Sequence, residues 1–164
     1  MIKSTENLAS KGYVVVAIDH TESTHADKAS FSSTLLNRTL DINFVLEQMS
    51  QKSAPQEESF LSGLLNADRT AVIGYSMGGY GALLAAGAGV SPEAVVNDWV
   101  PGSKLDMLQA GNSDYTSRLD DRIKAIVLFA PWGGHRGVWD KEGLKWKGFK
   151  KWTAVGLELH HSQP

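Results

Sequence analysis

A serine lies between two glycines in the segment Gly74-Tyr75-Ser76-Met77-Gly78, which has the spacing G-x-S-x-G. This spacing is typical of a nucleophile elbow, a sharp turn between a buried strand and a helix that exposes the serine hydroxyl above a sheet. Small residues on either side of the serine let the strand and helix backbones approach closely. The helix directs its free N–H groups to the same point, so the Met77 N–H is placed to stabilise an oxyanion. The motif predicts Ser76 as a nucleophile.

Glycines after a strand can also serve close helix packing or bind a phosphate. The run Gly79–Leu84 ends in leucine where the dinucleotide fingerprint requires glycine or alanine. No Lys-Ser or Lys-Thr pair follows to make a phosphate-binding loop. We therefore favour the nucleophile interpretation.

Three apolar runs predict the strands that must position this serine. They have no polar alternation, which is typical of strands buried on both faces of a parallel sheet. The runs are Tyr13–Ile18, Thr70–Gly74 and Ile123–Ala130.

Helical patterns alternate with these runs. We expect a helix that ends at Gly12, a second that begins near Arg38 and a third over 77–88. Ser91-Pro92-Glu93 predicts one further helix start, and the rest of 91–119 reads as irregular. The order of elements predicts a three-layer α/β fold, with a mostly parallel sheet and helices on both of its faces.

Composition limits the classes of function. The 164 residues are 42% hydrophobic and 21% charged, with a formal net charge of −2 and no cysteine. These values exclude disulfides, a thiol nucleophile and thiolate metal sites, and they argue against nucleic acid or an anionic membrane as a partner. We find neither a transmembrane run nor a signal peptide, so we expect a soluble chain whose compartment stays unknown.

Four segments resemble the dienelactone-hydrolase-like branch of the α/β-hydrolases, which is related to the lipase and polyester-hydrolase group. They are 13–21, 37–41, 72–81 and 129–133. The resemblance implies a serine hydrolase of carboxylic esters that works through an acyl-enzyme, with a small-molecule ester as its partner and no cofactor or metal. It implies Ser76 as the nucleophile, Met77 as an oxyanion donor and Trp132 as a residue lining the substrate cleft. Tyr75, beside the serine, is a second candidate for substrate binding or for plain packing.

A serine nucleophile needs a histidine and a carboxylate, which follow it in the order acid, then histidine. Asp140 with His160 or His161 has this order, but the separation is short, so these residues are weak candidates for the acid and base. The alternatives are a helix cap at Asp140 and an exposed tail at His160. His135 either lines the cleft or is solvated, and His20 with His25 lacks a third ligand for zinc.

The resemblance implies an earlier oxyanion strand and later acid and histidine strands that are not recognisable here. We therefore expect a fold truncated at both ends: 1–144 as a partial hydrolase core, with a cap-like segment at 91–119, and 145–164 as a divergent basic and aromatic tail. Unpaired sheet edges predict self-association. The alternative function is an inert hydrolase-like fragment, or a ligand-binding module that lacks the Asp and His of the triad.

Two further pairs of residues have structural interpretations. Arg38 and Asp41, at i and i+3, are expected to pair on a helix surface. Trp99 and Tyr115, in the segment 91–119, either cap the cleft or serve packing.

Overall fold

The computed structural model describes residues 2–24, 31–97 and 99–144, and its centre is a parallel pair of strands. β1 (Thr70–Tyr75) pairs with β2 (Ile123–Phe129), so that Tyr75 lies opposite Phe129. Both strands were predicted from their apolar runs, and both are confirmed. Because the strands are parallel, they end at the same edge of the sheet, where Ser76 follows β1.

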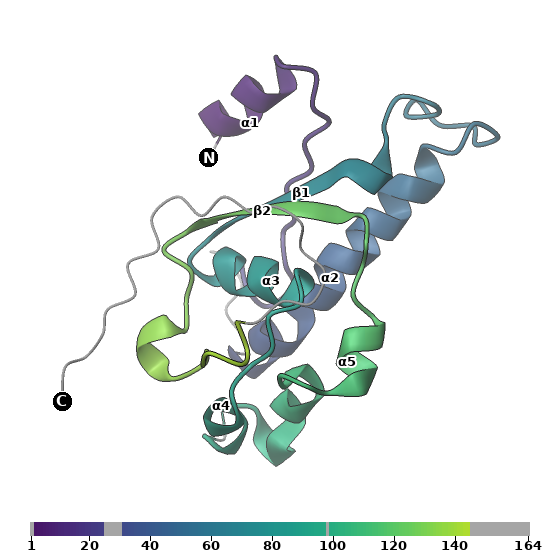
Figure 1. Cartoon of the computed structure of the whole chain (residues 1–164). Coiled ribbons are helices and arrows are strands. Elements are labelled where there is room, and N and C mark those ends of the chain that lie inside the picture. The colour runs from purple at the N-terminus through teal and green to yellow at the C-terminus, as the bar shows by residue number, and fades with distance from the viewer. Residues whose placement is uncertain (1, 25–30, 98, 145–164) are drawn as a thin grey trace.

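Two helices cover one face of this sheet. α2 (Phe31–Lys52) and α3 (Met77–Ala85) lie on the same side of the strands, whereas α1 (Ile2–Ala9) lies on the other side (Figure 1). The core between the sheet and its two covering helices is aliphatic. It contains Ile42 and Leu46 of α2, Ala82, Leu83 and Ala85 of α3, and Ile123, Ile126 and Leu128 of β2.

The segment between α3 and β2 is more regular than its sequence indicates. The predicted helix start at Ser91 is confirmed as α4 (Pro92–Val96), whose cap is the Ser91 hydroxyl, which accepts a hydrogen bond from the Ala94 N–H at 3.0 Å. Two further short helices follow, the 3-10 helix η2 (Pro101–Leu108) and α5 (Ser113–Ser117). Another short 3-10 helix, η1 (Ala67–Arg69), precedes β1, and η3 (Gly134–Arg136) follows β2.

The predicted helix boundaries differ from the observed ones at three ends. α2 begins at Phe31 rather than near Arg38, because Thr34 and Leu35 are buried and extend its core-facing side toward the N-terminus. α3 stops at Ala85 rather than at residue 88, because Gly87 adopts φ +100°, a left-handed conformation that ends helices. α1 ends at Ala9 rather than at Gly12, and Gly12 adopts the expected left-handed conformation, with φ +86°, in the turn that follows.

The prediction of a strand at Tyr13–Ile18 is wrong. A strand needs a neighbour for its backbone hydrogen bonds, and within the described residues β1 and β2 pair only with each other. The segment is neither helix nor strand, and its side chains are poorly covered: Tyr13 is 64% exposed and Val14 is 49% exposed.

The α/β class is confirmed, but the expectation that the strands are covered on both faces is wrong for the described part of the chain. Side chains of a strand alternate between its two faces. In β1, Gly74 faces α3, and the residues on either side of it, Ile73 and Tyr75, face the other way and are 51% and 68% exposed. Phe129, opposite Tyr75, is 44% exposed. We call this surface, made of Ala71, Ile73, Tyr75, Ala125, Val127 and Phe129, the open face.

In residues 2–24, 31–97 and 99–144, no helix combines the length and apolarity needed to cross a bilayer. The predicted tail at 145–164, which contains His160, lies outside the described residues.

Candidate active site

Ser76 occupies a strained turn between β1 and α3. Its backbone has φ 51° and ψ −117°, a conformation that L-residues rarely adopt and that persists only where the surroundings enforce it. Here the enforcement comes from main-chain hydrogen bonds. The Ser76 N–H donates to the Phe129 carbonyl at 3.0 Å, and the Ser76 carbonyl accepts from the N–H of Trp132 at 3.0 Å and of Tyr80 at 3.1 Å. The turn is therefore held both by the end of β2 and by the first turn of α3.

The two glycines of the motif are not equivalent. A Cβ atom on Gly74 would lie 2.2 Å from the Gly78 carbonyl oxygen, so this position admits no side chain. A Cβ atom on Gly78 would meet nothing within 4 Å. The sequence argument that both glycines are needed for close approach is right for Gly74 and wrong for Gly78. Gly79 is the second tight position, since its Cβ would lie 2.8 Å from Pro131.

Met77 is the first residue of α3. Its N–H therefore has no acceptor within the helix, and the first turn contains no acidic side chain that would offset the positive end of the helix dipole. The Met77 side chain packs against the buried cluster that contains Leu35 and Tyr80. This geometry leaves the Met77 N–H available next to the Ser76 hydroxyl.

Trp132 is brought to the turn by the chain that follows β2. Ala130 adopts φ 41°, which redirects the backbone immediately after the strand, and Pro131 packs on Gly79. The indole of Trp132 has three aromatic neighbours in edge-to-face geometry. The ring centroids lie 5.3 Å from Phe31, 5.7 Å from Tyr80 and 5.7 Å from Trp99.

Tyr75 and Trp132, the two predicted substrate-binding residues, are not brought together. Tyr75 points to the open face of the sheet, whereas Trp132 packs with α3 on the covered side. Tyr80 takes the place next to Trp132: it is fully buried, and its hydroxyl donates to the Leu35 carbonyl at 2.9 Å. Burial raises the pKa of Tyr80, so its hydroxyl stays protonated as a hydrogen-bond donor.

The acid and base predicted from sequence are not assembled around Ser76 within the described residues. The Ser76 hydroxyl makes no hydrogen bond in this part of the chain. Asp140 Oδ1 accepts from the Gly143 N–H at 2.6 Å and thereby caps a turn, and His135 is exposed beside Arg136. His160 lies outside the described residues, so the structure does not place it.

One histidine and one carboxylate do form a close pair, which joins the loop after Ile18 to the N-terminal half of α2. His20 Nδ1 lies 2.6 Å from Asp41 Oδ2, and Arg38 Nη2 donates to the Ser23 hydroxyl at 2.5 Å. Burial is the main effect on Arg38, and it lowers the pKa of the guanidinium. The expected pairing of Arg38 with Asp41 is therefore wrong, because each residue binds a partner in the loop after Ile18. The spacing of residues on one helix could not predict these contacts, since the partners lie 21 positions apart for His20 and Asp41 and 15 apart for Ser23 and Arg38.

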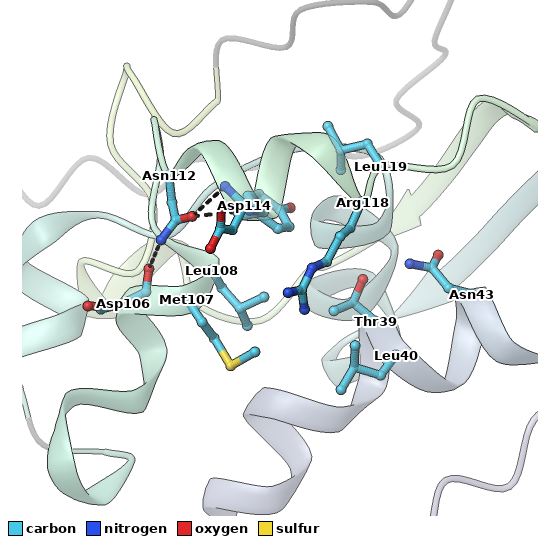
Figure 2. Close-up of a pocket in the computed structure, with 11 residues that line it drawn as sticks. Thr39, Leu40, Asn43, Asp106, Met107, Leu108, Asn112, Asp114, Arg118 and Leu119 are labelled. Carbon is cyan, nitrogen blue, oxygen red and sulfur yellow. Dashed lines mark hydrogen bonds between the residues drawn. The ribbon is translucent and has the colours of Figure 1, made fainter.

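A cavity of about 180 Å³ lies between α2 and the segment that contains η2 and α5 (Figure 2). Tyr115 lines it, and the Tyr115 hydroxyl binds the carbonyls of Leu84 and Ala88, at the end of α3 remote from Ser76. Figure 2 shows the Arg118 side chain extending from α5 toward Thr39 of α2. This cavity is therefore separate from the turn at Ser76. In the described residues no three His, Asp or Glu side chains gather as metal ligands.

A comparison with known protein families assigns the chain to one of them. The family model described as PET hydrolase-like matches residues 3–102, which is more than half of the chain. The chain belongs to the PET hydrolase-like family. This is a family of polyester hydrolases in the α/β-hydrolase superfamily, so the resemblance found in the sequence is confirmed. No significant match is found among curated proteins, and none among solved structures.

The matched region of this PET hydrolase-like chain includes the turn at Ser76 but not the whole site. Tyr75, Ser76 and Met77 lie inside residues 3–102. Trp132, Asp140 and His160 lie beyond them. Phe31, which sequence reasoning did not assign to the site, and Trp99, which it offered as a cap of the cleft or a packing residue, also lie inside the match. Phe31 carries no signal of its own in the sequence, because it precedes the apolar pattern from which the helix near Arg38 was predicted.

Proposed function

We propose that this PET hydrolase-like chain hydrolyses carboxylic esters with Ser76 as its nucleophile. The Ser76 oxygen attacks the ester carbonyl, the bond from carbonyl carbon to alkoxy oxygen breaks, and the alcohol leaves as the acyl-enzyme forms. Water then releases the acid and restores the serine. The observation that carries this proposal is the strained backbone of Ser76, held by Phe129 and Trp132 at the carboxyl ends of two parallel strands.

The Met77 N–H supports the same chemistry. The negative charge that develops on the carbonyl oxygen during attack is stabilised by donors already aimed at it. The Met77 N–H stands at the positive end of α3 with no acceptor inside the helix. We propose it as one of the oxyanion donors, and a small-molecule ester as the substrate.

The serine proton needs a base, and this requirement favours a second candidate function. Because no hydrogen bond joins the Ser76 hydroxyl to a histidine in the described part of the chain, a non-catalytic module that binds a ligand at the same turn is the alternative. Asp140 and His160 are our candidates for acid and base in the catalytic case. In that case the Asp140 carboxylate must accept a hydrogen bond from the histidine while its Oδ1 already accepts one from the Gly143 N–H.

A fluorophosphonate probe separates the two functions, because it bonds covalently only to an activated serine. We expect labelling of the purified chain, its loss in Ser76→Ala, and its retention in the control Ser117→Ala, whose hydroxyl caps a local turn in α5. Absence of labelling in the parent chain would favour the non-catalytic module. Labelling that persists in Ser76→Ala would show that the nucleophile is a different residue.

A further inference from the structure

The aromatic rings around Trp132 come from separate parts of the chain. Phe31 is the first residue of α2, Tyr80 belongs to α3, and Trp99 stands between α4 and η2 in the segment predicted as a cap. All three rings meet the indole edge to face or nearly so, with interplanar angles of 76°, 78° and 63° for Phe31, Tyr80 and Trp99. Such contacts hold an indole in one orientation.

This aromatic cluster adjoins the proposed nucleophile. The main-chain N–H of Trp132 donates to the Ser76 carbonyl at 3.0 Å. The Met77 side chain packs against the same buried cluster as Trp99 and Trp132. The Trp132 backbone and the Met77 side chain therefore link the turn at Ser76 to this cluster. The segment that carries Trp99 belongs to the same cluster, since Val100 and Leu105 are buried in it together with Leu35 and Tyr80.

The neighbours of Trp132 differ in how accessible they are. Tyr80 is fully buried and hydrogen-bonded to Leu35, so it is part of the structural core. Phe31 is 48% exposed, and Trp99 is partly buried. Phe31 and Trp99 are therefore the rings that a bound substrate can touch.

We propose that Phe31 and Trp99 are specificity-determining residues that limit the acyl group accepted at Ser76 to a short chain. The proposal rests on the proposed ester hydrolysis. The indole is contacted by three rings, so it cannot turn aside without breaking edge-to-face contacts, and the two outer rings fill the space into which a longer acyl chain would extend. A long chain must displace at least one of them, whereas an acetyl group need not.

Substitution of Phe31 and Trp99 tests the proposed limit on acyl-chain length. We expect the parent chain to prefer 4-nitrophenyl acetate to 4-nitrophenyl octanoate in kcat/KM. Trp99→Leu should raise the octanoate-to-acetate ratio about 10-fold, and Phe31→Leu about 3-fold, within the range that a few methylene groups produce in an apolar site. Phe60→Leu is the matched control, because Phe60 is 86% exposed and outside the cluster. A ratio unchanged in both variants, or a parent that prefers octanoate, overturns the proposal.

A binding measurement tests the limit on acyl-chain length separately from the proposed ester hydrolysis. In the Ser76→Ala background, the tryptophan indole N–H signals are followed by NMR as octanoate is added. We expect no shift without a second substitution and a saturable shift once Trp99→Leu or Phe31→Leu is present. If no variant hydrolyses either ester but octanoate binding still depends on Phe31 and Trp99, the proposed limit on acyl-chain length is supported and the proposed ester hydrolysis is wrong. Equal binding with and without the rings overturns the limit.

Discussion

The two faces of the strand pair β1 and β2 differ sharply in how they are covered. On the face toward α2 and α3, Ile126 and Leu128 are 1% and 2% exposed, and Gly74 is in contact with the backbone of α3. On the open face, Ile73 and Tyr75 are at least half exposed. The two sets of residues alternate along the same strands, so the difference arises from what packs on each face and not from the strands themselves (Figure 1).

This contrast shows which face of the sheet fixes the backbone of Ser76 in the proposed active site. Every contact that fixes Ser76 comes from the covered side or from the strand ends: Phe129 and Trp132 through hydrogen bonds, and α3 through close packing. The open face contributes the Tyr75 side chain, whose hydroxyl makes no hydrogen bond within the described residues. Substitutions on the covered face should therefore be costly, and matched substitutions on the open face should be nearly silent.

The largest effect is expected at Gly74. Gly74→Ala places a Cβ atom 2.2 Å from a backbone oxygen that cannot move without shifting α3, so the free energy of unfolding should fall by more than ~3 kcal/mol or the chain should fail to fold. Gly78→Ala, in the same motif, should change it by no more than about 1 kcal/mol, because no atom lies in the way. Urea unfolding followed by circular dichroism measures both. Equal losses would show that the two glycines have the same role.

A smaller effect is expected from a buried hydroxyl. Tyr80→Phe removes the hydrogen bond that the buried Tyr80 hydroxyl donates to the Leu35 carbonyl, and this loss should cost about 1 kcal/mol. Tyr75→Phe makes the same chemical change on the open face and should stay within about 0.5 kcal/mol of the parent. The measurement is again the midpoint and slope of urea unfolding. A loss in Tyr75→Phe as large as in Tyr80→Phe would contradict the contrast between the faces.

The ion pairs at the start of β2 predict a dependence on pH. The Arg122 guanidinium binds Asp120 at 2.6 Å and Glu47 of α2 at 3.0 Å, and its hydrogen bonds hold the pKa of the Asp120 carboxyl below its usual value. A lowered carboxyl pKa stabilises the fold above the unfolded value of about 4, and this contribution is lost as the pH falls through the folded pKa. We expect Asp120→Asn to cost about 1 kcal/mol at pH 7 and little once the carboxyl is protonated.

The control for this pH dependence is the neighbouring exposed carboxylate. Asp121→Asn should leave the unfolding free energy and its acid dependence close to those of the parent. The measurement is thermal or urea unfolding at a series of pH values from neutral down to about 3, where an unfolded aspartate becomes protonated. A parent chain and an Asp120→Asn variant that lose stability in parallel across this range would rule out the Asp120–Arg122 pair as the cause.

The smallest effect on folding, and a measurable effect on association, is expected from the open face. Because this face is apolar and both strands have an unpaired edge in the described residues, we expect the parent chain to self-associate. Ile73→Thr should raise the concentration at which association begins while changing the unfolding free energy by less than about 0.5 kcal/mol. Sedimentation velocity over a range of concentrations measures this. Val96→Thr, at a 77% exposed site on α4, should leave association unchanged.

The sequence predicted the local elements around the serine well and their neighbours poorly. β1, β2 and the turn at Ser76 were all located from apolar runs and the G-x-S-x-G spacing, since these depend on residues close together in the chain. The run Tyr13–Ile18 has the same apolar character but forms no strand, because strand formation requires a partner that local sequence does not supply. Likewise Phe31 could not be placed beside Trp132, since the contact joins positions far apart in the sequence.

The sequence by itself therefore determined the strand-turn-helix unit, the serine it exposes and the family to which the chain belongs, because steric and hydrogen-bonding rules act over a few residues. Only the tertiary structure decided which face of the sheet is covered, which glycine of the motif is indispensable, and that Asp41 binds His20 instead of Arg38. The physical reason is that burial and pairing depend on groups brought together by the whole chain.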